Sequence, residues 1–260
     1  MTNSVMAVIM GIVEGLTEYL PISSTGHLIL FGQWIHFDVS PTFDIAIQLG
    51  AILAVVVLYR RRFLSYLNFK IFSNKETQLI SIAILPALIL GFLFHGFIKH
   101  HLFSPLTVAW GLLVGGILML ITEHLLKDKS PSTNSLETIT RSQALLIGIC
   151  QCASLWPGVS RSASTIVGGL YGKLDYKTAA EFSFIIAVPV MVIATAYDFL
   201  KSYASLTSHD LGLIGIGFVV SFIVALGAIV TFLSLLQRWR LRPFALYRIF
   251  LGAFLLWLLY

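Results

Sequence analysis

The chain has 260 residues, of which 57% are hydrophobic and only 11% are charged. Soluble domains carry about 25% charged residues, so this composition excludes an ordinary soluble domain and predicts an all-α polytopic membrane protein. The formal net charge of +5 does not indicate a nucleic-acid partner, because that requires a clustered basic face on a soluble module.

Long apolar runs predict six transmembrane helices, each close to the roughly 17–25 residues that a spanning helix needs. The runs lie at about 43–59, 78–98, 105–122, 180–200, 211–236 and 243–260. Two other regions, 5–35 and 144–172, each hold two short apolar pieces separated by a break, at Pro21–Gly26 and Pro157–Ser164. Neither piece alone is long enough to span, and irregular backbone at membrane depth needs cover from protein or a wet cavity. We therefore interpret both regions as re-entrant helical hairpins.

The two broken regions resemble each other, which predicts an internal repeat. The matches are Gly11-Ile-Val-Glu14 with Gly148-Ile-Cys-Gln151, Pro21-Ile-Ser-Ser24 with Pro157-Gly-Val-Ser160, Phe43 with Phe182, and Pro105 with Pro243. Their offsets are 137, 136, 139 and 138 residues. Each half would hold one hairpin and three spans, and an odd number of spans inverts the second half. We predict one membrane domain of two inverted-topology repeats, about 1–127 and 141–260, with a polar linker at 128–140 and a site where the hairpins meet.

Lysine and arginine predict the orientation of the chain. In this arrangement thirteen of the 17 basic residues fall on one side of the membrane, and two, Lys99 and Lys201, fall on the other. The positive-inside rule then puts both termini outside the cytoplasm, with the first hairpin entering from outside and the second from inside. Arg161 and Arg248 are left over, one in a break and one in a span.

The first break carries two acids where ionisable groups are hardest to tolerate. Glu14 and Glu18 are one helical turn apart in an apolar segment, so they repel each other unless a cation lies between them. Such a pair would hold Mg²⁺ or Ca²⁺ through oxygens, although bonding to neighbouring helices is the plainer alternative. Asp44 and Gln48 could support the pair from the next span.

Hydroxyl groups and an imidazole follow the acids. A hydroxyl near an imidazole can be a nucleophile with its base, and the first break offers Ser23, Ser24, Thr25 and His27. A lone histidine would more often be a hydrogen-bonded core residue. The serines and threonine beside this one favour a functional role.

The second break supplies a cation. Arg161 stands between Ser160 and Ser162 at the start of a short apolar helix, and arginine beside helix N-terminal amides is suited to phosphate oxygens. Arg161 could instead snorkel from a helix end. The hydroxyls of Ser162, Ser164 and Thr165 could simply bond their own helix. Cation, arginine, hydroxyl and imidazole together suit phosphoryl transfer.

These two motifs closely resemble the signatures of the bacterial undecaprenyl pyrophosphate phosphatases, the bacitracin-resistance family. The stretches are Glu14-Gly-Leu-Thr-Glu-Tyr-Leu-Pro-Ile-Ser-Ser-Thr-Gly-His27 and Pro157-Gly-Val-Ser-Arg-Ser-Ala-Ser-Thr165, with further likeness at 43–50 and 242–248. The resemblance implies an enzyme of the bacterial cytoplasmic membrane that hydrolyses undecaprenyl diphosphate to the monophosphate on the outer face. This regenerates the lipid carrier for peptidoglycan synthesis and confers bacitracin resistance.

The resemblance also implies roles for residues. Glu14 and Glu18 would be the acidic pair tied to a divalent cation, and Ser24 and His27 the nucleophile and its partner. Arg161 and Ser160 would grip the diphosphate, with Ser23, Thr25 and Ser162 nearby as further substrate contacts. The sequence departs from the pattern at Ala163, where many relatives have glycine, and Gln151 stands where the first half has Glu14.

Several alternatives stay open. Either a serine–phosphate intermediate forms or a metal-bound water attacks. A transporter or flippase for a polyprenyl phosphate would use the same inverted repeats and broken helices, and another lipid-phosphate phosphatase is a further reading. We expect membrane lipids as neighbours, and a homo-oligomer is left open.

Overall fold

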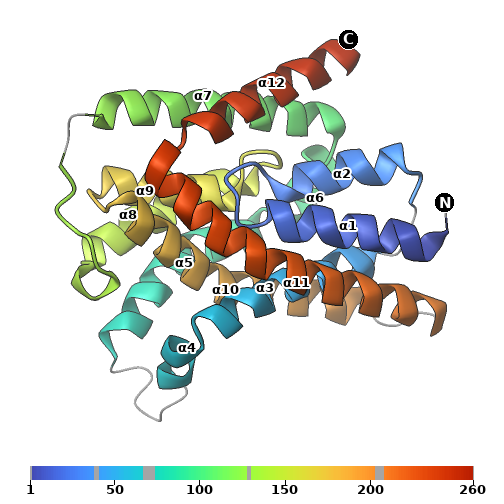
Figure 1. Cartoon of the computed structure of the whole chain (residues 1–260), viewed down its shortest axis with the longest axis horizontal. Helices are drawn as coiled ribbons and strands as arrows, with labels where there is room; N and C mark the ends of the chain where they lie inside the picture. Colours follow the sequence, from blue (N-terminus) through green and yellow to red (C-terminus); the bar gives the residue numbers. More distant parts are fainter. Residues whose placement is uncertain (1, 38–40, 67–73, 128–129, 203–207, 260) are drawn as a thin grey trace.

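The computed structural model describes residues 2–37, 41–66, 74–127, 130–202 and 208–259. In these ranges the chain forms α-helices and short 3-10 turns and no β-strand. The first half contains α1 (Asn3–Thr17), α2 (Ser24–Trp34), α3 (Pro41–Leu58), α4 (Arg60–Tyr66), α5 (Lys75–Leu93), α6 (His95–His101) and α7 (Pro105–Leu126). The second half contains η2 (Leu136–Thr138), α8 (Arg141–Gln151), η3 (Cys152–Leu155), α9 (Arg161–Tyr171), α10 (Tyr176–Ser202), α11 (Ser208–Trp239) and α12 (Arg242–Leu259) (Figure 1). Residues 128–129 of the predicted linker lie outside the described ranges.

Five helices in the described part of the chain are long and apolar enough to cross a membrane. They are Lys75–Leu93, Pro105–Leu126, Tyr176–Tyr197, Leu211–Trp239 and Arg242–Leu259. The predicted run at 43–59 falls on α3, whose described apolar stretch, Ala46–Leu58, is shorter than these five. The predicted run at 78–98 is divided between two helices. Helix α5 ends at Leu93, and the last residues of the run belong to α6.

The outer surface of the helices is apolar. Among its large side chains, Phe92 is 74%, Phe250 74% and Trp257 75% exposed to the surroundings of the chain. In a soluble protein such a surface would drive association, whereas on long apolar helices it is what contact with lipid requires. The chain is therefore an all-helical, multi-pass membrane protein.

Helix starts are set by local signals. Ser104 and Thr107 form a capping box at the start of α7, which also has Pro105 in its first turn. Thr140 and Gln143 form the same device at the start of α8. These caps satisfy backbone amides that would otherwise be left without partners, so each helix begins at a defined residue.

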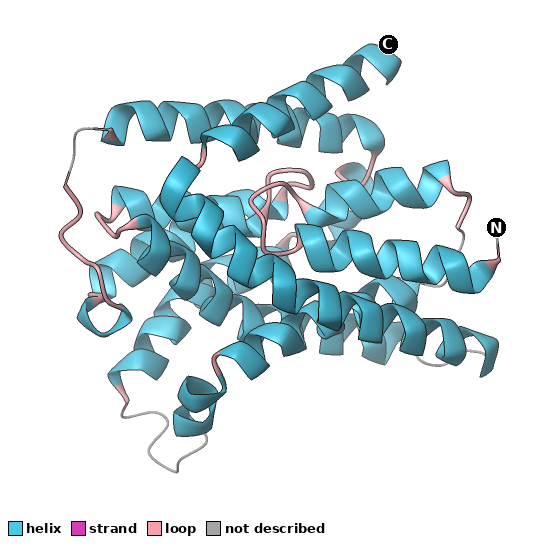
Figure 2. Cartoon of the chain, in the orientation of Figure 1, coloured by secondary structure: helices cyan, strands magenta, loops and turns pink. Residues whose placement is uncertain are grey.

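The helices pack so that the two irregular segments come to the centre. Helix α11 packs along both α1 and α3, α5 packs on α8, and α7 lies beside α12 (Figure 1). The loops that follow α1 and η3 are surrounded by these helices in the middle of the molecule (Figure 2). Tyr19, in the first loop, is fully buried and donates its hydroxyl to Ala51 O at 3.1 Å. Its ring meets the ring of Phe184 edge-on.

Candidate active site

The site is built on two interruptions of the helices. We call residues 18–23, together with the first turn of α2, break one, and residues 156–160, together with the first turn of α9, break two. The irregular residues 18–23 are as many as the predicted Pro21–Gly26 but begin three residues earlier, and residues 156–160 are fewer than the predicted Pro157–Ser164. Helix α2 begins already at Ser24 and α9 at Arg161, because Ser23 and Ser160 cap them. The hydroxyls and the arginine therefore stand in the first turn of a helix, where backbone amides and the helix dipole favour an anion.

The two caps share a left-handed φ, while their ψ values are 92° and 121°. Ser23 has φ 73° and Ser160 has φ 74°, values in the left-handed region that a residue with a side chain rarely adopts. The Ser23 hydroxyl accepts from Gly26 N at 3.4 Å, and the Ser160 hydroxyl accepts from Ala163 N at 3.3 Å. Strained backbone of this kind persists only where the surroundings hold it, and it gathers at functional sites.

Arg161 joins the two breaks. Its Nη2 donates to Glu18 Oε1 at 2.7 Å, in an ion pair whose side chains are 13% and 7% exposed. Its Nη1 donates to Ser183 O at 3.2 Å, and its guanidinium carbon lies 5.7 Å from the centre of the Tyr19 ring. Arg161 thus supplies the positive charge that compensates the buried carboxylate of Glu18.

Glu18 also receives the hydroxyl of Ser24, which donates to Glu18 Oε2 at 2.5 Å. Both oxygens of Glu18 therefore have partners, one from each break. The geometry joins Arg161, Glu18 and Ser24 into a continuous chain of charge-assisted hydrogen bonds.

Glu14 is different. It is fully buried, and neither of its carboxylate oxygens has a hydrogen-bond partner in the described part of the chain. Its electrostatic neighbours are Glu18, Asp44 and Arg161. A buried carboxylate without a partner is costly, so these orphaned oxygens fit a hard cation. Within the described residues, no group of three or more His, Cys, Asp or Glu side chains that could hold a metal ion is found.

The two ring nitrogens of His27 bond partners other than Ser24. Its Nδ1 bonds Ser23 O at 2.7 Å, and its Nε2 bonds the Tyr247 hydroxyl at 2.7 Å. A carbonyl only accepts, so Nδ1 must carry a proton, and in the neutral ring Nε2 is the acceptor. In this structure the Ser24 hydroxyl bonds the Glu18 carboxylate, and the pairing of Ser24 with His27 that the sequence suggested stays a prediction.

The remaining hydroxyls divide into two groups. Ser162 donates to Leu20 O at 2.9 Å and so ties break two to break one, and it also lies 3.1 Å from the Ser160 hydroxyl. Ser164 donates to Ser160 O and Thr165 donates to Arg161 O, at 2.9 Å each. Thr165 Oγ1 also lies 2.6 Å from the Ser183 hydroxyl on α10. Thr25 is half-buried at the start of α2.

Sequence reasoning missed the contribution of α12. Tyr247 contacts His27, and Arg248 contacts backbone of both breaks. The signal for Arg248 was present, since it is an arginine inside an apolar span. Tyr247 carried no comparable signal, because tyrosine is common at span ends.

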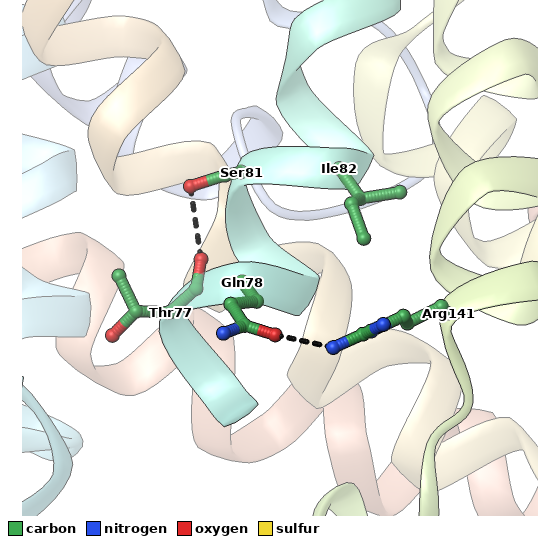
Figure 3. Close-up of a pocket in the computed structure, with 5 residues that line it drawn as sticks. All are labelled: Thr77, Gln78, Ser81, Ile82 and Arg141. Carbon is green, nitrogen blue, oxygen red and sulfur yellow. Dashed lines mark hydrogen bonds between the residues drawn. The ribbon is translucent and has the colours of Figure 1, made fainter. Parts of the chain in front are cut away.

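A surface pocket lies elsewhere. It has a volume of about 290 Å³ and is lined by Thr77, Gln78, Ser81, Ile82 and Arg141. Figure 3 shows these side chains on α5 and at the start of α8, with Arg141 bonded to Gln78. None of the residues of the two breaks lines it, so it is separate from the candidate site.

The chain has relatives along almost its entire length. Residues 7–254 match the family model described as bacitracin resistance protein BacA. A protein named undecaprenyl-diphosphatase 1 from Bacillus thuringiensis (strain Al Hakam) is 49% identical over 258 residues, which cover 97% of each chain. A protein of the same name from Bacillus anthracis has the same identity and coverage. An undecaprenyl-diphosphatase from Maridesulfovibrio salexigens is 51% identical over 262 residues, covering 98% of each chain.

Proposed function

Since this chain belongs to the bacitracin resistance family BacA, we propose that it hydrolyses undecaprenyl diphosphate to undecaprenyl phosphate and inorganic phosphate. Relatives that match nearly the whole chain at 49% and 51% identity carry the name of that activity. The observation that carries the proposal is the bonded series Arg161–Glu18–Ser24, buried among apolar helices. In the bacterial cell this reaction recycles the lipid carrier for peptidoglycan synthesis and confers bacitracin resistance.

Ser24 is the nucleophile in this proposal. Its Oγ attacks the terminal phosphorus, the bridging P–O bond breaks, and undecaprenyl phosphate leaves with the bridging oxygen. The serine proton passes to Glu18, whose Oε2 already accepts from that hydroxyl at 2.5 Å. Water then hydrolyses the phosphoserine. His27 faces the Tyr247 hydroxyl rather than the serine, so its role is to hold or move a proton on the α12 side of the site.

Arg161 binds the diphosphate together with the start of α9. Its side chain is 13% exposed and bonds Glu18. It can keep this contact with Glu18 while its remaining N–H groups donate to phosphate oxygens. The amides in the first turns of α2 and α9 add donors. Ser23, Ser160 and Ser162 fix those turns, and Thr25 is a further substrate contact.

A divalent cation, Mg²⁺ or Ca²⁺, fits the partnerless oxygens of Glu14. Glu14 and Glu18 would hold it, and phosphate oxygens of the substrate would complete the ligand set. Such a cation neutralises phosphate charge.

The chain is proposed to have six spans and two re-entrant hairpins in inverted repeats, about 1–127 and 141–260. Support comes from the matching caps at Ser23 and Ser160. It also comes from packing, because α1 lies on α11 as α8 lies on α5, which are corresponding pairs under the predicted offset. The caps pair Ser23 with Ser160, one residue away from the match that the prolines suggested.

The protein is proposed to act in the cytoplasmic membrane with its site open to the outer face. Support comes from the distribution of Lys and Arg, which puts both termini outside. Cysteines introduced at the half-buried positions Thr25 and Val159, in a chain lacking Cys150 and Cys152, should both react with an impermeant thiol reagent added outside. Labelling at Val159 only from the cytoplasm would contradict a shared outward-facing site.

The activity is tested with purified protein in detergent and undecaprenyl diphosphate. We expect phosphate release without a membrane gradient. The rate with added Mg²⁺ or Ca²⁺ is compared with the rate without added metal and with the rate in the presence of a chelator. A protein that binds the lipid but releases no phosphate in any of these conditions would be a transporter or flippase instead.

A further inference from the structure

Arg248 is a buried cation that the proposed reaction does not use. It lies on α12 in an apolar span and has 0% exposure. A charged side chain inside a membrane protein is costly unless it has partners, and such residues are usually functional. Full burial also excludes snorkelling, since the guanidinium does not reach an interface.

The guanidinium is held entirely by neutral acceptors. Nη1 donates to Pro21 O at 3.2 Å, and Nη2 donates to Gly158 O at 2.9 Å and to Gly111 O at 3.0 Å. A weaker contact joins Nη1 to Met119 Sδ at 3.6 Å. No described salt bridge includes Arg248. One side chain thus bonds backbone of break one, of break two and of α7.

The carbonyls of Pro21 and Gly158 occupy equivalent positions in the two breaks. Pro21 stands three residues before Ser24, and Gly158 stands three residues before Arg161. The carbonyls that Arg248 joins therefore belong to the short segments that present the nucleophile and the cation.

Helix α7 leaves room for this arrangement. A Cβ atom added at Gly115 would collide with Arg248 Nη2, and one added at Gly111 would collide with Pro157 O. The two glycines are one turn apart on α7. One makes space for the guanidinium and the other for break two.

Only a planar group with several donors can serve these acceptors together. Arginine has five N–H donors in a fixed fork, whereas lysine is a compact point charge on a flexible stem. A side chain needed only to pack α12 against α7 would not have to reach both breaks.

From these contacts we propose that Arg248 is a positioning residue, which fixes break one against break two so that Ser24 and Glu18 face Arg161. It does not touch the substrate. The proposal rests on the proposed function for its kinetic consequence, but its structural consequence can be measured separately.

The test compares Arg248→Met, Arg248→Lys and Gly115→Ala with the wild type. Arg242→Met, an exposed arginine on the same helix, and Gly227→Ala, where an added Cβ meets nothing within 4 Å, are the matched controls. Misplacement by about 1 Å can cost about 100-fold in rate. We expect kcat for phosphate release to fall by about 100-fold in Arg248→Met with a much smaller change in KM. The other two variants should fall between it and the controls.

A second readout follows the breaks directly. Spin labels at the exposed positions Gln33 on α2 and Tyr171 on α9, in a chain lacking Cys150 and Cys152, report the distance between the helices that follow the two breaks. We expect a narrow distribution in the wild type and a broadened one in Arg248→Met, with unchanged helix content.

Three results would overturn the proposal. One is a normal kcat in Arg248→Met, even with a lowered Tm, since that is what a packing role predicts. Another is a lowered kcat with an unchanged distance distribution. If Arg248→Met does not fold, normal kcat in both Gly115→Ala and Arg248→Lys would be the third. Absence of phosphate release in the wild type would instead contradict the proposed function, and the distance measurement would still test the positioning.

Discussion

Break one and break two have the same kind of helix cap and different chemistry. In each, a serine of positive φ caps the helix that follows. One turn further on, the side chain of His27 bonds Ser23 O at 2.7 Å, and that of Ser164 bonds Ser160 O at 2.9 Å. The same local scaffold therefore holds both segments.

The reactive side chains are divided between them. At an offset of 137 residues, Ser24 corresponds to Arg161, and Glu18 corresponds to Leu155. Break one supplies the acid and the hydroxyl, and break two supplies the cation that pairs with the acid. The comparison indicates that a site can be completed by reusing a backbone and placing complementary charges on its two copies.

The largest effect is expected from removal of the Ser24 hydroxyl, at the position where break two has Arg161. Ser24→Ala should lower kcat by at least about 10,000-fold, because removal of a nucleophile in other hydrolases costs even more. A phosphoserine should be trapped at short times in the wild type by rapid quench. Ser164→Ala, which removes a hydroxyl bonded within its own helix, is the control. Turnover of Ser24→Ala within tenfold of wild type, with no trapped phosphoenzyme, would establish attack by water.

The next effect concerns the cation that only break two has. Arg161→Met should lower kcat/KM by about 1,000-fold, since it removes donors to the phosphate and leaves Glu18 buried without its partner. Arg161→Lys should remain strongly impaired, because lysine cannot bind bidentately. Arg242→Lys is the control. Near-normal turnover of Arg161→Lys would show that the phosphate is held elsewhere.

A smaller effect is expected at Glu14 and Gln151, on the helices α1 and α8 that precede the two breaks. Both side chains are buried and without hydrogen-bond partners in the described residues, but only Glu14 is charged. Glu14→Gln should raise the Mg²⁺ or Ca²⁺ concentration needed for half-maximal activity by about tenfold or more, because it removes a charged oxygen ligand. Gln151→Asn should leave that concentration unchanged. An unaltered metal titration in Glu14→Gln would place the cation elsewhere.

The smallest effect is expected at Tyr247. Tyr247→Phe removes one hydrogen bond to His27 Nε2, and such a bond is worth about 1 kcal/mol, which is about fivefold in rate. The change should be seen in kcat measured across pH rather than in KM. The control Tyr171→Phe, at another exposed tyrosine, should match the wild type. If kcat of Tyr247→Phe also matched the wild type across pH, the result would contradict a role of Tyr247 in the site.

Much of this structure was predictable because it follows from local pattern. The apolar runs predicted the long helices, and Pro21 and Pro157 with their hydroxyl neighbours predicted the breaks. The partner of Ser24 was not predictable, because the choice between Glu18 and His27 depends on the turn between α1 and α2 rather than on spacing. Tyr247 reaches His27 across 220 residues of sequence, and such a contact is set by packing of α12.

A double-mutant cycle on Glu18 and Arg161 tests most directly that the two breaks form one site. The rate of phosphate release from undecaprenyl diphosphate is measured for the wild type, Glu18→Gln, Arg161→Met and the double variant, with folded protein verified for each. We predict strong coupling, so that the double variant is little slower than the worse single variant. Effects that simply multiply would mean that Glu18 and Arg161 act independently, and would contradict a site shared by both breaks.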